Sequence, residues 1–342
     1  MQTSPSGPAA APDPREPAVG APVLHEVGSG EAQVAALRVA SALFATVSDA
    51  VRGKDDAVRL ALVALLSGSH LLVDDVPGTG KTLLGKSLAA ALGGRFGRVQ
   101  CTPDLLPSDL TGTTVYSPVT GSWDFRPGPV FANVVLVDEV NRASPRTQAA
   151  LLEPMEEHQV TVDGTTHALP DPCFMIATQN PLGTVGTFPL PESQLDRFGI
   201  VLTMGLPGRD AEREILTGAG GASVLPSLDA VTTPAEMRAV IAAVRQVYCA
   251  PAVLEYVLDI AAAVRAHPDI VMGASPRATL ALFHAAQAHA TISRRHFVTP
   301  DDVKAVAPAV LAHRVMFGSG VDVAAGNATV SALVDALPVP TP

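Results

Sequence analysis

The strongest chemical signal in this sequence is a turn of small residues that ends in a lysine and a threonine. It follows an apolar segment at 71–73 and precedes a helical pattern at 81–92. In such a turn, successive backbone N–H groups converge on phosphate oxygens, and the positive end of the following helix faces the same point. The lysine adds a charge for the β- and γ-phosphates, and the threonine hydroxyl can ligate magnesium. We therefore expect ATP and Mg²⁺ to be held by Asp75, Val76, Pro77, Gly78, Thr79, Gly80, Lys81 and Thr82.

Two carboxylates, Asp138 and Glu139, follow a second apolar run at 134–137. The carboxyl end of a buried parallel strand is where ligands of open α/β sheets bind. Asp138 is predicted to hold Mg²⁺ through its water shell, and Glu139 to orient and polarise the water that attacks the γ-phosphate. The alternative is that both cap the next helix, but Ser144 and Pro145 already supply its N-cap and first-turn proline.

Further segments occur in the order typical of one protein family. They are Gly53-Lys54, Val-Pro-Gly-Thr-Gly-Lys-Thr at 76–82, Thr-Pro-Asp-Leu-Leu-Pro-Ser-Asp-Leu-Thr-Gly at 102–112, Gly-Pro-Val-Phe-Ala-Asn at 128–133, Asp-Glu-Val-Asn-Arg-Ala at 138–143, Ala-Thr-Gln-Asn-Pro at 177–181 and Leu-Pro-Glu-Ser-Gln-Leu-Asp-Arg-Phe at 190–198. Over about residues 35–318 the chain resembles the MoxR family of AAA+ ATPases. The resemblance implies an α/β P-loop NTPase fold, with a parallel sheet core in strand order 5-1-4-3-2 and a C-terminal all-helical lid domain. The general P-loop pattern has glycine at the position of Asp75, where this family commonly has aspartate.

Three more site residues follow from the resemblance. Asn180 resembles sensor 1, which holds the attacking water or the γ-phosphate by hydrogen bonds. Arg197 looks like the arginine finger that reaches the nucleotide of an adjacent subunit, and Arg277 resembles sensor 2, acting on its own or a neighbour's nucleotide. The alternatives are a turn-forming asparagine, a surface salt bridge from Arg197 to Glu192 or Asp196, and a first-turn arginine without a role.

The elements that must position these residues alternate along the chain. Apolar runs predict strands at 71–74, 98–101, 134–138, 173–178 and 200–203, mostly separated by helical patterns. From residue 209 onward the pattern is almost purely helical, and Pro207-Gly208 marks the boundary. We expect an ATPase core at 31–207, a helical lid at 208–318, and disordered tails rich in Pro, Ala or Gly at 1–30 and 319–342.

Two segments of the core interrupt this alternation as hairpins. Alternating apolar residues flank Thr120-Gly121 at 115–125, and Asp163-Gly164 is a strong hairpin turn within 159–169. Both resemble inserts of the MoxR group and are candidate contacts for a protein client. The alternative is that Tyr116, Trp123 and Phe125 pack across the hairpin or onto the core. Elsewhere, Pro154 is expected to kink the helical pattern at 145–158.

Composition excludes several classes of function. The formal net charge is −10 without a basic block, which disfavours a non-specific nucleic-acid partner. No apolar run has transmembrane length, and the first residues lack the pattern of a signal peptide. Cys101, Cys173 and Cys249 are too few and too far apart for a disulfide framework. We expect a cytoplasmic protein.

The interpretation that fits these signals is an ATP-hydrolysing subunit of a homo-hexameric ring that remodels or matures a protein client. The family resemblance adds a partner with a von Willebrand factor A domain. One alternative is a metal-chelatase-like subunit or a nucleic-acid motor, since related AAA+ groups share these inserts. Another is a scaffold that binds ATP with negligible turnover, against which the complete set of site residues argues.

Overall fold

A computed structural model describes residues 30–180, 186–217, 225–318 and 320–340. Its centre is a five-stranded parallel sheet in the order β2 (Phe96–Gln100), β5 (Val134–Asp138), β8 (Phe174–Gln179), β1 (His70–Asp74) and β9 (Phe198–Leu202). When these five strands are numbered 1 to 5 in chain order and read from β9, the order is 5-1-4-3-2. The predicted topology is therefore confirmed. The predicted strands are present with their ends shifted by one or two residues, a common uncertainty where a strand leaves its ladder.

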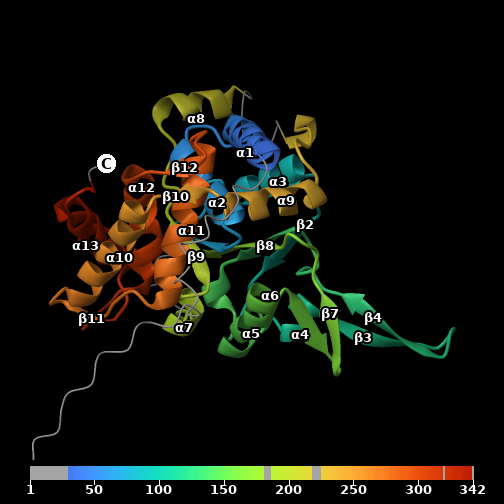
Figure 1. Cartoon of the computed structure of the whole chain (residues 1–342). Helices are drawn as coiled ribbons and strands as arrows, with labels where there is room; N and C mark the ends of the chain where they lie inside the picture. Colours follow the sequence, from blue (N-terminus) through green and yellow to red (C-terminus); the bar gives the residue numbers. More distant parts are fainter. Residues whose placement is uncertain (1–29, 181–185, 218–224, 319, 341–342) are drawn as a thin grey trace, which may run out of the picture.

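The sheet is buried on both faces, because its strands alternate between two apolar clusters. In β1, Leu71 and Val73 join one cluster, whereas Leu72 joins the other. The first cluster contains the apolar sides of α1 (Gly30–Ala50), α2 (Asp55–Leu66), α3 (Lys81–Leu92) and α9 (Pro234–Val244). The opposite face carries α4 (Pro107–Thr111), η1 (Val140–Arg142), α5 (Pro145–Ala149) and α6 (Leu152–Glu157) (Figure 1).

The C-terminal part is helical, as expected, and lies beside the edge strand β9 (Figure 1). Its main helices α10 (Pro251–Ala266), α11 (Pro276–Ile292) and α12 (Pro300–Leu311) share the apolar cluster of α1 and α2. The remaining elements of this part are short: α8 (Arg209–Leu216), η3 (Leu225–Ser227), η4 (Ala312–Arg314), and the strand pairs β10 (Tyr248–Cys249) with β12 (Phe297–Val298) and β11 (Ile270–Met272) with β13 (Met316–Phe317). The boundary at Pro207-Gly208 stays a prediction.

The expectation of disorder over 319–342 is wrong, because this segment contains the helix α13 (Val323–Ala336). Asp322 caps it by accepting a hydrogen bond from the N–H of Ala325 at 3.0 Å. Val330 and Val334, four residues apart, are buried on one face, and the Tyr256 hydroxyl donates to the Val334 carbonyl at 3.4 Å. The i, i+4 spacing of these two valines is present in the sequence, but the many small residues around them make the apolar pattern of the helix weak. The expected tail at 1–30 lies outside the described residues except for Gly30, which begins α1.

Both predicted hairpins are present and extend from the lower face of the sheet (Figure 1). The first pairs β3 (Gly112–Ser117) with β4 (Ser122–Pro127), and the second pairs β6 (Gln159–Val162) with β7 (Thr165–Ala168). Asp163 and Gly164 both have positive φ, at 49° and 78°, as a two-residue hairpin turn requires.

The helical pattern at 145–158 is divided in two rather than kinked. The helix α5 ends at Ala149 and α6 begins at Leu152, which puts Pro154 in the first turn of α6. A proline fits there because the N–H groups of a first turn have no acceptor within the helix. The break therefore lies upstream of the proline. No helix in the described ranges is long and apolar enough to cross a membrane.

Candidate functional site

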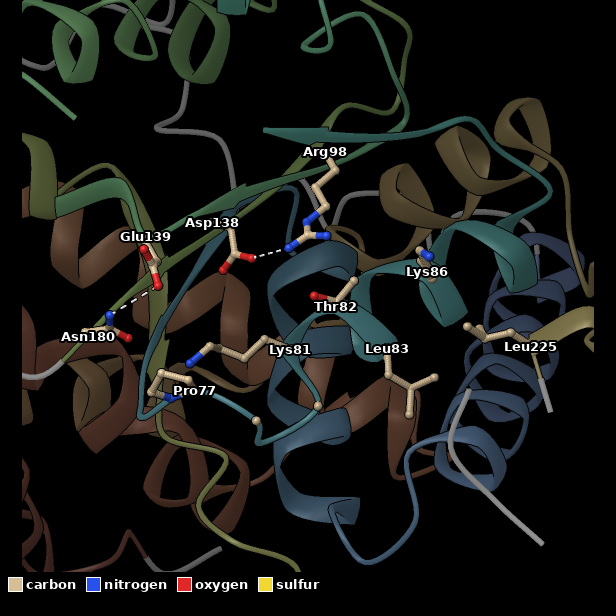
Figure 2. Close-up of a pocket in the computed structure, with 12 residues that line it drawn as sticks. Pro77, Lys81, Thr82, Leu83, Lys86, Arg98, Asp138, Glu139, Asn180 and Leu225 are labelled. Atoms are coloured by element: carbon tan, nitrogen blue, oxygen red, sulfur yellow. Dashed lines mark hydrogen bonds and ion pairs between the residues drawn. The ribbon is translucent and has the colours of Figure 1, made fainter. Parts of the chain in front are cut away.

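The phosphate loop and the two carboxylates meet at one cavity of about 510 Å³, which we call the P-loop cavity (Figure 2). The predicted residues that line it are Pro77, Gly78, Gly80, Lys81, Thr82, Asp138, Glu139 and Asn180. Four further described residues complete its lining: Leu83, Lys86, Arg98 and Leu225. The cavity lies at the carboxyl ends of β1, β5 and β8, because parallel strands bring these ends to one edge of the sheet.

The loop reaches its shape through two glycines and one carboxylate. Gly78 and Gly80 have φ of 88° and 98°, which other residues rarely adopt. The Asp75 carboxylate accepts hydrogen bonds from the N–H of Val76 at 2.7 Å and of Gly205 at 2.6 Å. Asp75 therefore ties the loop to the segment after β9, which gives a structural role to the residue that departs from the general P-loop pattern.

Not every loop residue reaches the cavity. Asp75 and Thr79 are buried within the loop, and Val76 is half-exposed outside the cavity lining. Lys54, from the Gly53-Lys54 motif, donates to the carbonyls of Met204 at 2.9 Å and Gly205 at 2.8 Å. Its role here is to hold the segment after β9 against the start of α2.

Lys81, at the start of α3, is held by the loop itself. Its Nζ donates to the carbonyl oxygens of Asp75 at 2.7 Å and Val76 at 2.8 Å. Burial lowers the pKa of Lys81, and the charges of Asp75, Asp138, Glu139 and Asp74 oppose that shift. Because an ammonium has three N–H donors, the two loop bonds leave one for a phosphate oxygen.

The two carboxylates are positioned by Thr178 of β8, which the sequence reasoning did not single out. The Thr178 hydroxyl donates to Oδ1 of Asp138 at 2.7 Å, and its oxygen accepts from the backbone N–H of Glu139 at 2.9 Å. Glu139 has a left-handed backbone, with φ 55° and ψ 48°. That conformation costs a non-glycine residue about 1 kcal/mol, which the bond to Thr178 helps to offset.

The Glu139 side chain lies between an amide and a guanidinium. The Asn180 amide donates to Oε1 of Glu139 at 3.5 Å, and Arg142 contacts Oε2 at 3.1 Å. The structure thus places the sensor-1 candidate beside the expected general base. It also gives Arg142 a local ion pair.

A further residue at the site, Arg98, was not predicted from the sequence. Its Nη2 lies 2.8 Å from Oδ2 of Asp138 (Figure 2).

Arg197 and Arg277 are not among the described residues that line the P-loop cavity. They lie together at a second cavity of about 240 Å³, where both pair with Glu156 of α6. The Arg197 Nε also donates to the Ser193 carbonyl at 3.2 Å, and Arg277 lies 3.8 Å from Asp196. Arg197 therefore forms an ion pair within the chain, as the structural alternative expected, but its partner is Glu156 and not Glu192 or Asp196.

The chain on either side of Arg197 is anchored by the buried Arg314. Its Nε pairs with Asp196 at 2.8 Å and its Nη2 donates to the Phe198 carbonyl at 2.9 Å. Burial lowers the pKa of Arg314, and the charge of Asp196 opposes that effect. Arg197 thus projects from a fixed backbone, with a side chain that is one-fifth exposed.

Models of known protein families match both the core and the C-terminal part of the chain. The model of the family described as "ATPase family associated with various cellular activities (AAA)" matches residues 70–200, and that of the AAA lid domain matches residues 262–332. The chain is 46% identical over 264 residues to the uncharacterized protein YeaC of Bacillus subtilis, covering 77% of this chain and 82% of that protein.

Two relatives carry the family name. Chaperone MoxR1 of Mycobacterium tuberculosis is 37% identical over 304 residues, with 85% of this chain and 80% of the relative covered. Protein MoxR of Methylorubrum extorquens is 32% identical over 324 residues, with 85% and 92% covered. The crystal structure named "putative ATPase" from Cytophaga hutchinsonii superposes with a TM-score of 0.82 at 30% identity, over 91% of this chain and 98% of that one. The chain belongs to the MoxR family of AAA+ ATPases.

Proposed function

We propose that this protein binds ATP with Mg²⁺ in the P-loop cavity, hydrolyses it, and works as a subunit of a homo-hexameric ring. The observation that carries the proposal is the convergence of Lys81, Asp138, Glu139 and Asn180 on one cavity at the sheet edge. These residues come from the ends of two strands, β5 and β8, and from the start of α3, so their meeting is not explained by local sequence.

The residues at the cavity suit Mg²⁺, which prefers oxygen ligands and keeps several waters. We assign it to the Thr82 hydroxyl and, through water, to the Asp138 carboxylate, which line the same cavity. When bound, Mg²⁺ supplies charge that neutralises the β- and γ-phosphate oxygens. Lys81 and the backbone N–H groups of the loop hold the same phosphates in place.

The proton-accepting group is Glu139. Its carboxylate, held between Asn180 and Arg142, orients the attacking water and takes up its proton. The Asn180 amide, 3.5 Å from Glu139, fixes that water or the γ-phosphate by a hydrogen bond. Thr178 keeps the two carboxylates in register, so that metal binding and water activation occur side by side.

We assign Arg197 and Arg277 to the nucleotide of a neighbouring subunit. Their position at a cavity separate from the P-loop cavity supports action in trans. A guanidinium that reaches the γ-phosphate stabilises the charge that develops there during transfer.

The output of the cycle is the remodelling or maturation of a protein client in the cytoplasm, with a von Willebrand factor A domain protein as partner. The exposed tip of the β3–β4 hairpin supports a contact of this kind, since Val119 and Trp123 are 95% and 70% exposed. The relative named chaperone MoxR1 is consistent with a protein client.

The test of the proposal is the substitution Glu139→Gln. The isosteric amide accepts no proton, so turnover should fall by about 100-fold or more while ATP affinity stays within a few-fold of the wild type. Turnover is measured by phosphate release and affinity by calorimetry. Near-normal turnover in the variant would refute the assignment of Glu139. Stimulation of the wild-type ATPase by DNA, and not by a partner protein, would favour a nucleic-acid motor.

A further inference from the structure

Arg98 is the one cation that contacts the proposed metal-binding carboxylate in the described part of the chain. It projects from β2 into the P-loop cavity, and its Nη2 lies 2.8 Å from Oδ2 of Asp138 (Figure 2). The same nitrogen donates to Oε1 of Gln100 at 3.2 Å. The Arg98 side chain is 47% exposed, whereas that of Asp138 is 14% exposed.

The Asp138 carboxylate is already engaged at both oxygens. Oδ1 accepts from the Thr178 hydroxyl at 2.7 Å, and Oδ2 faces Arg98. A Mg²⁺ ion whose water shell binds Oδ2 must therefore share that oxygen with the Arg98 guanidinium or displace the guanidinium from it. Two cations within a few ångströms repel each other, and this cost is larger at a partly buried site than in water.

We propose that Arg98 and Mg²⁺ are alternative partners of Asp138, so that the ion pair with Arg98 opposes metal binding and is given up when Mg²⁺ and nucleotide bind together. This inference rests on the proposed function, since it requires nucleotide and Mg²⁺ at the P-loop cavity. It goes beyond that function by making Arg98 a positioning residue that sets how strongly nucleotide binding depends on the metal.

Charge balance at the cavity supports this role. Lys81, Lys86 and Arg98 line the same cavity as Asp138 and Glu139, so cations remain near the phosphates when Mg²⁺ is scarce. A guanidinium has five N–H donors, and only one nitrogen of Arg98 is engaged by Asp138 and Gln100. The remaining donors are available to phosphate oxygens, which are favourable partners for a planar fork.

The test compares the affinity for a fluorescent ADP analogue in excess Mg²⁺ and in EDTA. The ratio of the two dissociation constants, EDTA over Mg²⁺, measures how much the metal strengthens binding. In Arg98→Gln this ratio should rise by about fivefold, as expected for the loss of one half-exposed ion pair. The rise should include weaker binding in EDTA, because the phosphates lose a nearby cation.

Lys86→Gln is the matched control. Lys86 lines the same cavity from α3, but it is not among the described groups that contact Asp138. Its loss should weaken nucleotide binding by a similar factor with and without Mg²⁺, leaving the ratio unchanged. Arg98→Lys keeps a cation near Asp138 and should keep most of the wild-type ratio, which also controls for damage to the fold.

An unchanged or lowered ratio in Arg98→Gln would overturn the inference, because it would mean that Arg98 and Mg²⁺ act independently or together. That outcome leaves the proposed function intact, provided that wild-type protein binds the analogue more tightly with Mg²⁺. Failure of the wild type to bind nucleotide under either condition would instead refute the proposed function itself.

Discussion

The guanidinium groups of Arg197 and Arg277 converge on one carboxylate, that of Glu156 in α6. Arg197 immediately precedes β9, and Arg277 lies in the first turn of α11, so this contact joins the core to the lid. Burial raises the pKa of Glu156, but the hydrogen bond from Arg277 and the charge of Arg197 lower it by more, and the net shift is downward. Glu156 is therefore ionised at neutral pH and holds the two arginines as one unit.

Mixing two inactive variants tests the proposed action of Arg197 on the nucleotide of a neighbouring subunit. Arg197→Ala and Glu139→Gln should each be inactive alone, because each removes one part of every site. When equal amounts assemble at random, a site works only if its own chain keeps Glu139 and its neighbour keeps Arg197, so about a quarter of the sites should recover. The measurement is ATP turnover of the mixture against the two separate variants. If subunits demonstrably exchange and no activity returns, Arg197 acts within its own chain or only in the fold.

Lys81→Ala should abolish tight ATP binding. The substitution removes the only lysine that bridges the loop carbonyls and the phosphate side of the cavity among the described residues. Losing charge-assisted bonds to the phosphates should weaken the affinity by about 100-fold or more. Calorimetry with ATP and Mg²⁺ measures this directly. Unchanged affinity in a folded variant would show that the phosphates bind elsewhere.

Trp123→Ala and Phe125→Ala should separate a partner contact from a packing role in the first hairpin. Trp123 is 70% exposed and touches Tyr116 across the hairpin, at 5.3 Å between ring centroids. Phe125 instead stacks on His167 of the second hairpin at 3.8 Å. We expect Trp123→Ala to change the melting temperature by less than about 2 °C and to reduce stimulation by a partner protein, whereas Phe125→Ala lowers the melting temperature by several degrees.

A loss of thermal stability in Trp123→Ala, with stimulation preserved in the folded fraction, would contradict the partner contact. It would favour the packing role that the sequence left open.

Asp302→Asn should destabilise the lid in a pH-dependent manner. Asp302 is fully buried, and burial raises its pKa, but bonds from His289, Arg295 and Thr299 outweigh that effect and bring it to about 2. A carboxyl with a lowered folded-state pKa contributes stability above its ordinary pKa, near 3.8, and loses it as the pH falls toward 2. At pH 7 the substitution Asp302→Asn should lower the free energy of unfolding by about 2 kcal/mol, because it removes a helix cap and ionic hydrogen bonds.

Urea denaturation of wild type and variant at several pH values measures this difference. It should be constant from pH 7 to about 5 and shrink between pH 4 and pH 2. Asp301→Asn, at the exposed neighbouring carboxylate, is the matched control and should change stability by less than about 0.5 kcal/mol. A difference that persists unchanged to pH 2 would mean that the charge of Asp302 is not what stabilises the lid.

The sequence by itself determined those features that depend on local backbone chemistry. Gly78 and Gly80 allow the positive φ angles that shape the phosphate loop and that other residues rarely adopt. The apolar run before Asp138 specifies a strand buried on both faces. The Asp163-Gly164 turn predicted a hairpin. Each of these signals is contained within a few consecutive residues, which is why no knowledge of distant contacts was needed. The sheet topology, in contrast, was implied by the family resemblance, which rests on motifs spread along the whole core.

Only the tertiary structure decided which distant side chains meet. The contacts of Thr178 and Arg98 with Asp138 join three strands, and the sequence contains no signal for which neighbour each side chain reaches. The helix α13 was missed for a related reason: its small residues give a weak apolar pattern, and its stability depends on close packing. At Gly326 an added Cβ would lie 2.4 Å from the Ala312 carbonyl oxygen, so this helix forms where another backbone is near enough to cover it.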